Sequence, residues 1–169
     1  MLDIHELAAG KLAALFARAA SRDLFDVRAL LAASPLDREK LRLGFVVYGG
    51  INRRDWRTLA VKDVQADPAE VDRQLVPLLR ADVAPARTDL VLWTERLVAE
   101  CRARVSAVLP LRAAEIEFLH RLNDQGDMAP ELLTADKGLQ NTIRAHPGLR
   151  WKALNVRGHR GMADVGEEE

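Results

Sequence analysis

The segment between residues 7 and 20 contains only two charged residues, Lys11 and Arg18, and nearly all of the others are alanine or leucine. Alanine and leucine have high helix propensities, so this segment predicts an α-helix over about residues 3–20. A helix that is apolar on almost every side is usually buried. The chain must therefore supply other helices that cover this one, which constrains the fold more than any other feature.

Lys11 and Arg18 are seven residues apart, so they project from almost the same side of that helix at about 100° per residue. An unpaired buried charge is costly, so both cations require partners. The partners are carboxylates of the chain itself or a bound anion such as phosphate. Asp23 and Asp26 follow closely, and Arg22 and Asp26 have the four-residue spacing of a helical ion pair. Spacing alone favours internal salt bridges over an anion-binding site.

Capping residues and apolar periodicity predict helices in most of the remaining chain. We place them at residues 21–34, 37–48, 68–79, 88–108, 113–123, 136–145 and 147–156. Gly49 and Gly50 are expected to end the helix at 37–48, and Gly126 to close the one at 113–123. Residues 45–48 could also form a strand, and residues 56–64 a short strand or a single helical turn. We therefore predict a mainly α fold, a helical bundle with little or no sheet.

A single helical domain is expected over residues 1–160, because 169 residues are enough for one substantial core. Within it, residues 1–34 should form a helix pair and residues 88–160 the carboxy-terminal helices. Residues 161–169 end in Gly-Glu-Glu-Glu and are expected to form an acidic flexible tail.

The charge balance limits the classes of function. Lysine and arginine total 25, as do aspartate and glutamate, so the formal net charge is zero. This balance argues against a general nucleic-acid coat or a membrane-surface protein. The sequence also lacks an apolar run long enough to cross a bilayer and a signal peptide at its start. The single cysteine, Cys101, cannot form an internal disulfide, so we expect a core role for it, a cytoplasmic location and no membrane association.

The cations and acids of the first helix pair form a two-part motif. Residues 6–18 follow E-L-x-A-x-K-x-x-A-L-x-x-R, and residues 22–26 read R-D-L-F-D. This motif resembles the AbiEii/AbiGii-type nucleotidyltransferase toxins of type IV toxin–antitoxin and phage-abortive systems. A second block at residues 130–156, which includes His-Pro-Gly-Leu-Arg-Trp, also resembles the family. The chain would then correspond to the helical carboxy-terminal half of an α/β nucleotidyltransferase.

The resemblance implies a role for each charged residue of the motif. Lys11 matches the lysine that holds the triphosphate of the incoming nucleotide, and Asp26 matches a catalytic aspartate that orients a group or acts as a base. Arg18 and Arg22 are additional phosphate-binding candidates, because guanidinium groups match phosphate geometry. Asp23 is a supporting residue, which orients Arg22 or Lys11 or complements the helix dipole. These roles require Lys11 and Asp26 to lie together beside a concave surface.

The resemblance also implies a nucleoside triphosphate and Mg²⁺, but the family's metal-binding motif is missing. Family members carry a glycine-serine turn and a D-x-D pair that holds divalent ions, and this sequence has no D-x-D. Gly49-Gly50 is followed only by the single Asp55, so we reject it as a substitute, and no metal ligands are assigned. Met1 falls where the family's sheet region would meet the first helix. We therefore interpret the chain as a truncated product, a late start or half of a split enzyme, inactive without a complementing amino-terminal half.

Two functional hypotheses remain. In the first, the chain contributes triphosphate contacts to nucleotide transfer onto an RNA, such as a tRNA end, or onto a protein, and it has a cognate antitoxin. In the second, it is a non-catalytic helical module that binds an antitoxin or RNA, and its charged motif residues are internal ion pairs.

The far end of the chain is basic. No acidic residue occurs between positions 137 and 160, which contain six lysine and arginine residues and Trp151. Arg150, Lys152 and Arg157 are candidate RNA contacts, because cations with an aromatic suit phosphate pairing and base stacking. The alternative is a solvated cationic face with Trp151 packed in the core. We favour core packing for Trp151 and leave the function of the cations open.

Overall fold

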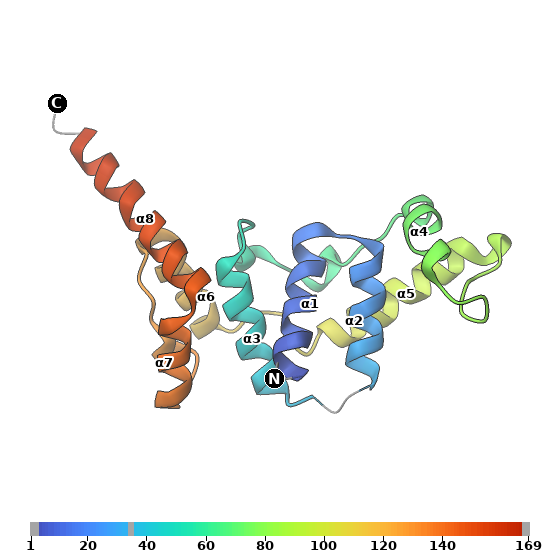
Figure 1. Cartoon of the computed structure of the whole chain (residues 1–169), viewed down its shortest axis with the longest axis horizontal. Helices are drawn as coiled ribbons and strands as arrows, with labels where there is room; N and C mark the ends of the chain where they lie inside the picture. Colours follow the sequence, from blue (N-terminus) through green and yellow to red (C-terminus); the bar gives the residue numbers. More distant parts are fainter. Residues whose placement is uncertain (1–3, 34–35, 167–169) are drawn as a thin grey trace. The chain divides into compact units, whose positions relative to one another are not determined.

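The computed structural model describes residues 4–33 and 36–166. Over these two ranges the chain forms eight α-helices, short 3₁₀ turns and one π-helical turn, with no β-strand (Figure 1). The predicted mainly α fold is therefore confirmed. The chain divides into two compact units, residues 1–45 with 59–110 and residues 46–58 with 111–169. The domain limits predicted at residues 1–160 and 161–169 stay a prediction.

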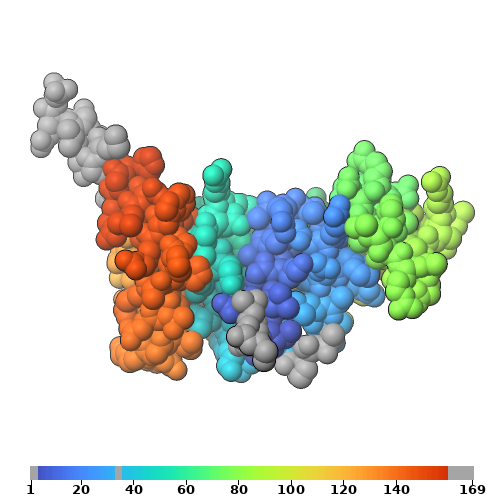
Figure 2. All heavy atoms as spheres, viewed as in Figure 1, coloured from blue at the N-terminus to red at the C-terminus, as the bar shows by residue number. Residues whose placement is uncertain are grey.

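The first unit is built around helix α1, Ile4–Arg18. Helix α2, Ser21–Ala33, lies beside α1 after a short turn (Figures 1 and 2). Ala19 makes this turn with a left-handed backbone, φ 52°, and its N–H donates to Leu15 O over 2.9 Å. This bond satisfies one of the carbonyl groups that the end of a helix leaves free. The turn fixes the register between the two helices that carry the charged motif.

Helices α3 (Arg38–Ile51), α4 (Pro68–Gln74) and α5 (Leu90–Val105) follow. Helix α1 buries Ala8, Ala9, Leu12, Ala13, Leu15 and Phe16. Leu7 and Ala17 are exposed, so the helix is covered on part of its circumference and not on almost every side as expected. The Phe16 ring meets Phe45 edge to face, with ring centroids 5.8 Å apart.

Buried Arg42 donates to the carbonyl groups of Ala107 and Pro110 over 3.1 and 3.0 Å, so its charge is solvated by backbone oxygens. Cys101 is a core residue as expected, and burial raises the pKa of its thiol to about 12.

The second unit contains helices α6 (Ala113–His120), α7 (Lys137–Ala145) and α8 (Pro147–Gly166) with residues 46–51 of α3. Its core includes Phe118, Leu119, Leu122, Leu149 and Ala153. A π-helical turn, Arg121–Gln125, extends α6 and ends at Gly126. Gly126 is left-handed, with φ 66°, so it closes this helical segment as predicted.

The predicted end of the third helix is wrong. Helix α3 continues through Gly49 and Gly50 to Ile51, and residues 45–48 are helical throughout. The two glycines are there for close packing. The ring of Trp56 occupies the space that a Cβ at Gly49 would need, and a Cβ at Gly50 would lie 2.9 Å from a methyl group of Leu122. Residues 56–64 contain two 3₁₀ turns, Trp56–Thr58 and Val61–Asp63, and no strand.

None of the helices in the described ranges is both long enough and apolar enough to cross a bilayer.

The second unit contains a cluster of charges around Arg57. Arg57 donates to Asp55, with Nη2–Oδ2 2.7 Å, and to Asp124, which also lies 2.7 Å from His120 Nδ1. The hydrogen bonds from Arg57 are the main cause that lowers the pKa of both carboxyl groups below the ordinary value of 3.8. A carboxylate with a lowered folded-state pKa stabilises the fold above its unfolded pKa. This stabilisation is lost as the pH falls through the lowered value.

We therefore expect Arg57→Met to remove part of the acid sensitivity. At about pH 6 the variant should be less stable than the wild type, and the difference in unfolding free energy should shrink as the pH falls below about 4. Denaturant titrations over this pH range give the measurement. The control is Arg80→Met, which removes a much more exposed pair with Asp82. A difference for Arg57→Met that is constant with pH would contradict the prediction.

Candidate functional site

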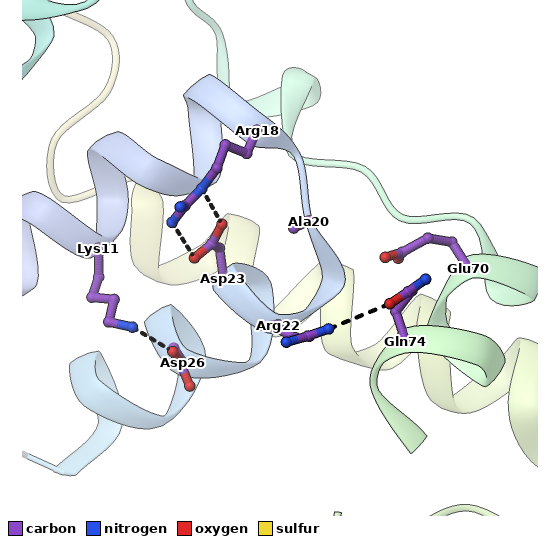
Figure 3. Close-up of a pocket in the computed structure, with 8 residues that line it drawn as sticks. All are labelled: Lys11, Arg18, Ala20, Arg22, Asp23, Asp26, Glu70 and Gln74. Atoms are coloured by element: carbon purple, nitrogen blue, oxygen red, sulfur yellow. Dashed lines mark hydrogen bonds and ion pairs between the residues drawn. The ribbon is translucent and has the colours of Figure 1, made fainter. Parts of the chain in front are cut away.

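Helices α1, α2 and α4 line an open pocket of about 530 Å³ in the first unit (Figure 3). Its charged wall comes from the motif: α1 supplies Lys11 and Arg18, and α2 supplies Arg22, Asp23 and Asp26 within its first two turns. Helix α4 supplies the remaining polar side chains, Glu70 and Gln74. The structure therefore brings all five motif residues named from the sequence to one concave surface.

Lys11 and Asp26 point toward one another across the two helices (Figure 3). The Lys11 Nζ lies 2.6 Å from Asp26 Oδ2, and the two side chains are 39% and 48% exposed. The juxtaposition that the sequence interpretation required is present. An exposed ion pair of this kind contributes only about 0–1 kcal/mol to stability, so a stronger anion can replace the carboxylate at the lysine at little cost.

Arg18 and Asp23 form a two-pronged pair. Arg18 Nε and Nη2 donate to the two carboxylate oxygens of Asp23 over 3.1 and 3.0 Å. The Asp23 side chain is 8% exposed, whereas that of Arg18 is 65% exposed. Asp23 thus holds the base of an outward-facing guanidinium group, and its partner is neither Arg22 nor Lys11, the two considered from the sequence. Asp23 also lies in the first turn of α2, where a negative charge complements the helix dipole.

Arg22 differs from the other two cations of the pocket. It donates to the neutral side-chain oxygen of Gln74 over 3.3 Å, and the four-residue pair with Asp26 is not formed. Within the described ranges, Arg22 has no carboxylate at salt-bridge distance, whereas Lys11 and Arg18 each have one. Of the three cations of the pocket, Arg22 is therefore the one whose charge is not neutralised by a carboxylate. We expect an anion to bind Arg22 without breaking an existing ion pair.

Sequence reasoning missed Glu70 and Gln74. They lie on a short helix whose start is fixed by Asp67, which accepts a hydrogen bond from Ala69 N over 3.0 Å, and by Pro68. Nearly fifty residues separate this helix from the start of α2, and neither side chain belongs to a motif. Only the packing of α4 against α2 brings them to the pocket.

The described residues do not fit a metal ion. Over residues 4–33 and 36–166 no three histidine, cysteine, aspartate or glutamate side chains are grouped so that they could hold one. No chemical step in this chain is therefore assigned to Mg²⁺.

The candidate RNA contacts lie on α8 in the second unit. Arg150 and Arg157 are exposed, whereas Lys152 donates to the carbonyl group of Asn52 over 2.7 Å. Partial burial lowers the pKa of the Lys152 ammonium group. Core packing of Trp151 was the wrong expectation, because its side chain is 65% exposed. Leu149 and Ala153 fill the core from α8, and Trp151 lies two residues from each, on the opposite side of the helix.

These features define a helical protein with a cation-lined pocket at a paired lysine and aspartate. The family model for the nucleotidyl transferase AbiEii toxin of type IV toxin–antitoxin systems matches residues 1–96. This match covers more than half of the chain, so the protein belongs to that family. The match includes α1, α2 and α4, and the block at residues 130–156 lies outside it. No match was found among curated proteins or among solved structures.

Proposed function

We propose that this chain forms the triphosphate-binding wall of a nucleotidyltransferase toxin, with Lys11, Arg18 and Arg22 as phosphate contacts and Asp26 as the catalytic acid–base residue. The observation that supports this proposal most directly is the contact between Lys11 and Asp26 at the edge of the pocket. A volume of about 530 Å³ lies in the usual range of small-molecule sites.

The charges suggest an order of events. A triphosphate first binds Arg22, which is not paired with a carboxylate. It then replaces Asp26 as the ion-pair partner of Lys11. Asp23 already orients the exposed guanidinium group of Arg18. Phosphate binding therefore costs this side chain little additional conformational entropy. In nucleotide transfer an acceptor hydroxyl attacks the α-phosphorus and diphosphate leaves. Released from Lys11, the Asp26 carboxylate is free to accept the proton of that hydroxyl.

We propose that the chain is inactive alone, because its sequence lacks a D-x-D pair and its described residues offer no metal site. A complementing segment would supply these aspartates and Mg²⁺, which stabilises the negative charge of the reacting phosphates. Membership of a type IV toxin family implies a cognate antitoxin. An RNA or protein acceptor, the complementing half and a cytoplasmic location belong to the proposal.

The second hypothesis, a non-catalytic module that binds an antitoxin or RNA, also has support. Lys11 and Arg18 each already contact a carboxylate of the chain, as internal ion pairs would. Under this hypothesis Arg22 and the pocket have no ligand. The purified chain should then bind its protein or RNA partner and show no affinity for nucleotides in any form.

A labelled-nucleotide experiment distinguishes the two hypotheses. The full chain is incubated with each α-labelled nucleoside triphosphate, Mg²⁺ and total RNA, with and without the aspartate-bearing segment of a family member. Transfer only in the presence of the added segment supports the proposal, and transfer by the chain alone contradicts the proposed inactivity. Calorimetric titration of the complemented enzyme with the same nucleotides should show binding. No binding there would contradict the phosphate-site assignment.

A further inference from the structure

Helix α8 exposes two large apolar side chains on one side. Trp151 and Leu154 are 65% and 62% exposed, and they lie one turn apart. Trp151 is the one aromatic residue among the exposed large hydrophobic side chains of the described ranges. A tryptophan has 150–250 Å² of mostly apolar surface to bury, roughly, so its exposure leaves a large favourable contact unmade. Such a side chain is typical of a surface that meets a partner.

The residues beside Trp151 and Leu154 are positively charged. Arg150 and Arg157 lie on the Leu154 side of the helix, about 20° apart around its axis and about 10 Å apart along it. Both side chains are exposed, and neither guanidinium group has a hydrogen-bond or ion-pair partner in the described part of the chain. No acidic residue occurs between positions 137 and 160. The side chains Arg150, Trp151, Leu154 and Arg157 form what we call the α8 surface.

Lys152, the residue after Trp151, already has a partner. Lys152 is tied to the carbonyl group of Asn52 over 2.7 Å, which holds the segment after α3 against α8. The next residue in that segment is Arg53, which is exposed and has no partner among the described residues. Lys152 is therefore not available to the α8 surface, whose two cations, Arg150 and Arg157, lie on one side of the indole.

We propose that the α8 surface binds single-stranded nucleic acid, with a base stacked on the Trp151 indole and phosphates held by Arg150 and Arg157. A flat, exposed aromatic ring beside two unpaired guanidinium groups matches a stacked base together with phosphates of the same strand. Double-stranded nucleic acid matches less well, because its bases are already stacked on one another. This proposal uses no residue of the α1–α2 pocket, so it does not depend on the proposed nucleotide site.

The test is an anisotropy titration of the full chain against a labelled RNA single strand of about 12 nucleotides, repeated at several salt concentrations. Trp151→Ala should weaken binding about 5- to 150-fold, since stacking contributes about 1–3 kcal/mol per base, and should leave the salt dependence unchanged. Arg150→Ala and Arg157→Ala should each weaken binding and reduce the slope of log affinity against log salt by about 0.7. Leu92→Ala, which alters a half-exposed apolar residue of α5, is the matched control and should bind as the wild type does.

Comparison ligands separate the alternatives. If single-stranded DNA of the same sequence binds as tightly as the RNA, the result supports recognition by base stacking and phosphate contacts. If the RNA binds more tightly, the surface also contacts the 2′-hydroxyl groups. A duplex that binds as tightly as the single strand overturns the proposal. Unchanged RNA affinity in Trp151→Ala, or a surface that binds a protein partner and no nucleic acid, overturns it as well. Lys11→Ala should leave RNA affinity unchanged, which keeps this test distinct from that of the nucleotide site.

Discussion

Replacing Lys11 with alanine is expected to weaken binding of a nucleoside triphosphate to the complemented enzyme about 10- to 150-fold. The substitution removes a charge-assisted hydrogen bond to phosphate, which contributes about 1.5–3 kcal/mol. The fold should be unaffected, because the Lys11 side chain is 39% exposed and its ion pair with Asp26 contributes little stability. Calorimetric titration gives the affinity, and circular dichroism with thermal unfolding checks the fold.

Two matched variants sharpen this prediction. Asp26→Asn removes the other half of the same ion pair, so Lys11 no longer has to exchange a carboxylate for phosphate. This variant should bind the nucleotide at least as tightly as the wild type and yet lose transfer. Lys40→Ala removes an exposed lysine elsewhere in the same unit and should change nothing. Equal affinities in Lys11→Ala and the wild type would support the non-catalytic module instead.

Phe45→Ala is expected to lower the unfolding free energy by about 3–5 kcal/mol, the usual cost of truncating a buried phenylalanine. Phe45 is fully buried, and its ring is packed against that of Phe16 on the central helix. A single domain has only about 5–15 kcal/mol of stability, so the variant should be close to unfolding at physiological temperature. Denaturant titration monitored by circular dichroism provides the measurement. Leu92→Ala should stay within about 0.5 kcal/mol of the wild type, and a loss below about 1 kcal/mol in Phe45→Ala would contradict this packing.

The charged wall of the pocket could be predicted because its residues are close together in the sequence. Lys11 and Arg18 had to face one way on a continuous helix, and Asp23 and Asp26 had to follow after a turn too short to move them far. What the sequence could not show was which cation meets which acid. The four-residue spacing of Arg22 and Asp26 suggested an ion pair between them. In the structure Asp26 of α2 instead forms an ion pair with Lys11 of α1.

The wrong end of the third helix and the missed residues of α4 have a common physical origin, which is packing between separate segments. Gly49 and Gly50 have the properties of a helix end, and only the approach of Trp56 and Leu122 shows why they lie inside α3. Glu70 reached the pocket through helix packing that no local pattern encodes. These contacts join residues that are up to about seventy positions apart.

Trp151 was misplaced for a different reason, because its side chain was judged by type instead of by position. Leu149 and Ala153 are four residues apart and therefore share one side of α8. Trp151 lies halfway between them and must face away from that side. The helical period alone, applied to residues 147–156, could have identified it as exposed.

The short turn at Ala19 joins two helices whose charged side chains must match in register. Adding one residue inside α1 between Lys11 and Arg18, or removing one, would rotate the two cations by about 100° relative to each other, so that one of them would leave its acid. The fifteen-residue spacing between Lys11 and Asp26 is therefore set by the helical register of α1 and α2 and by the short turn that joins them. In related chains we expect substitutions between these two positions to be much more common than insertions or deletions.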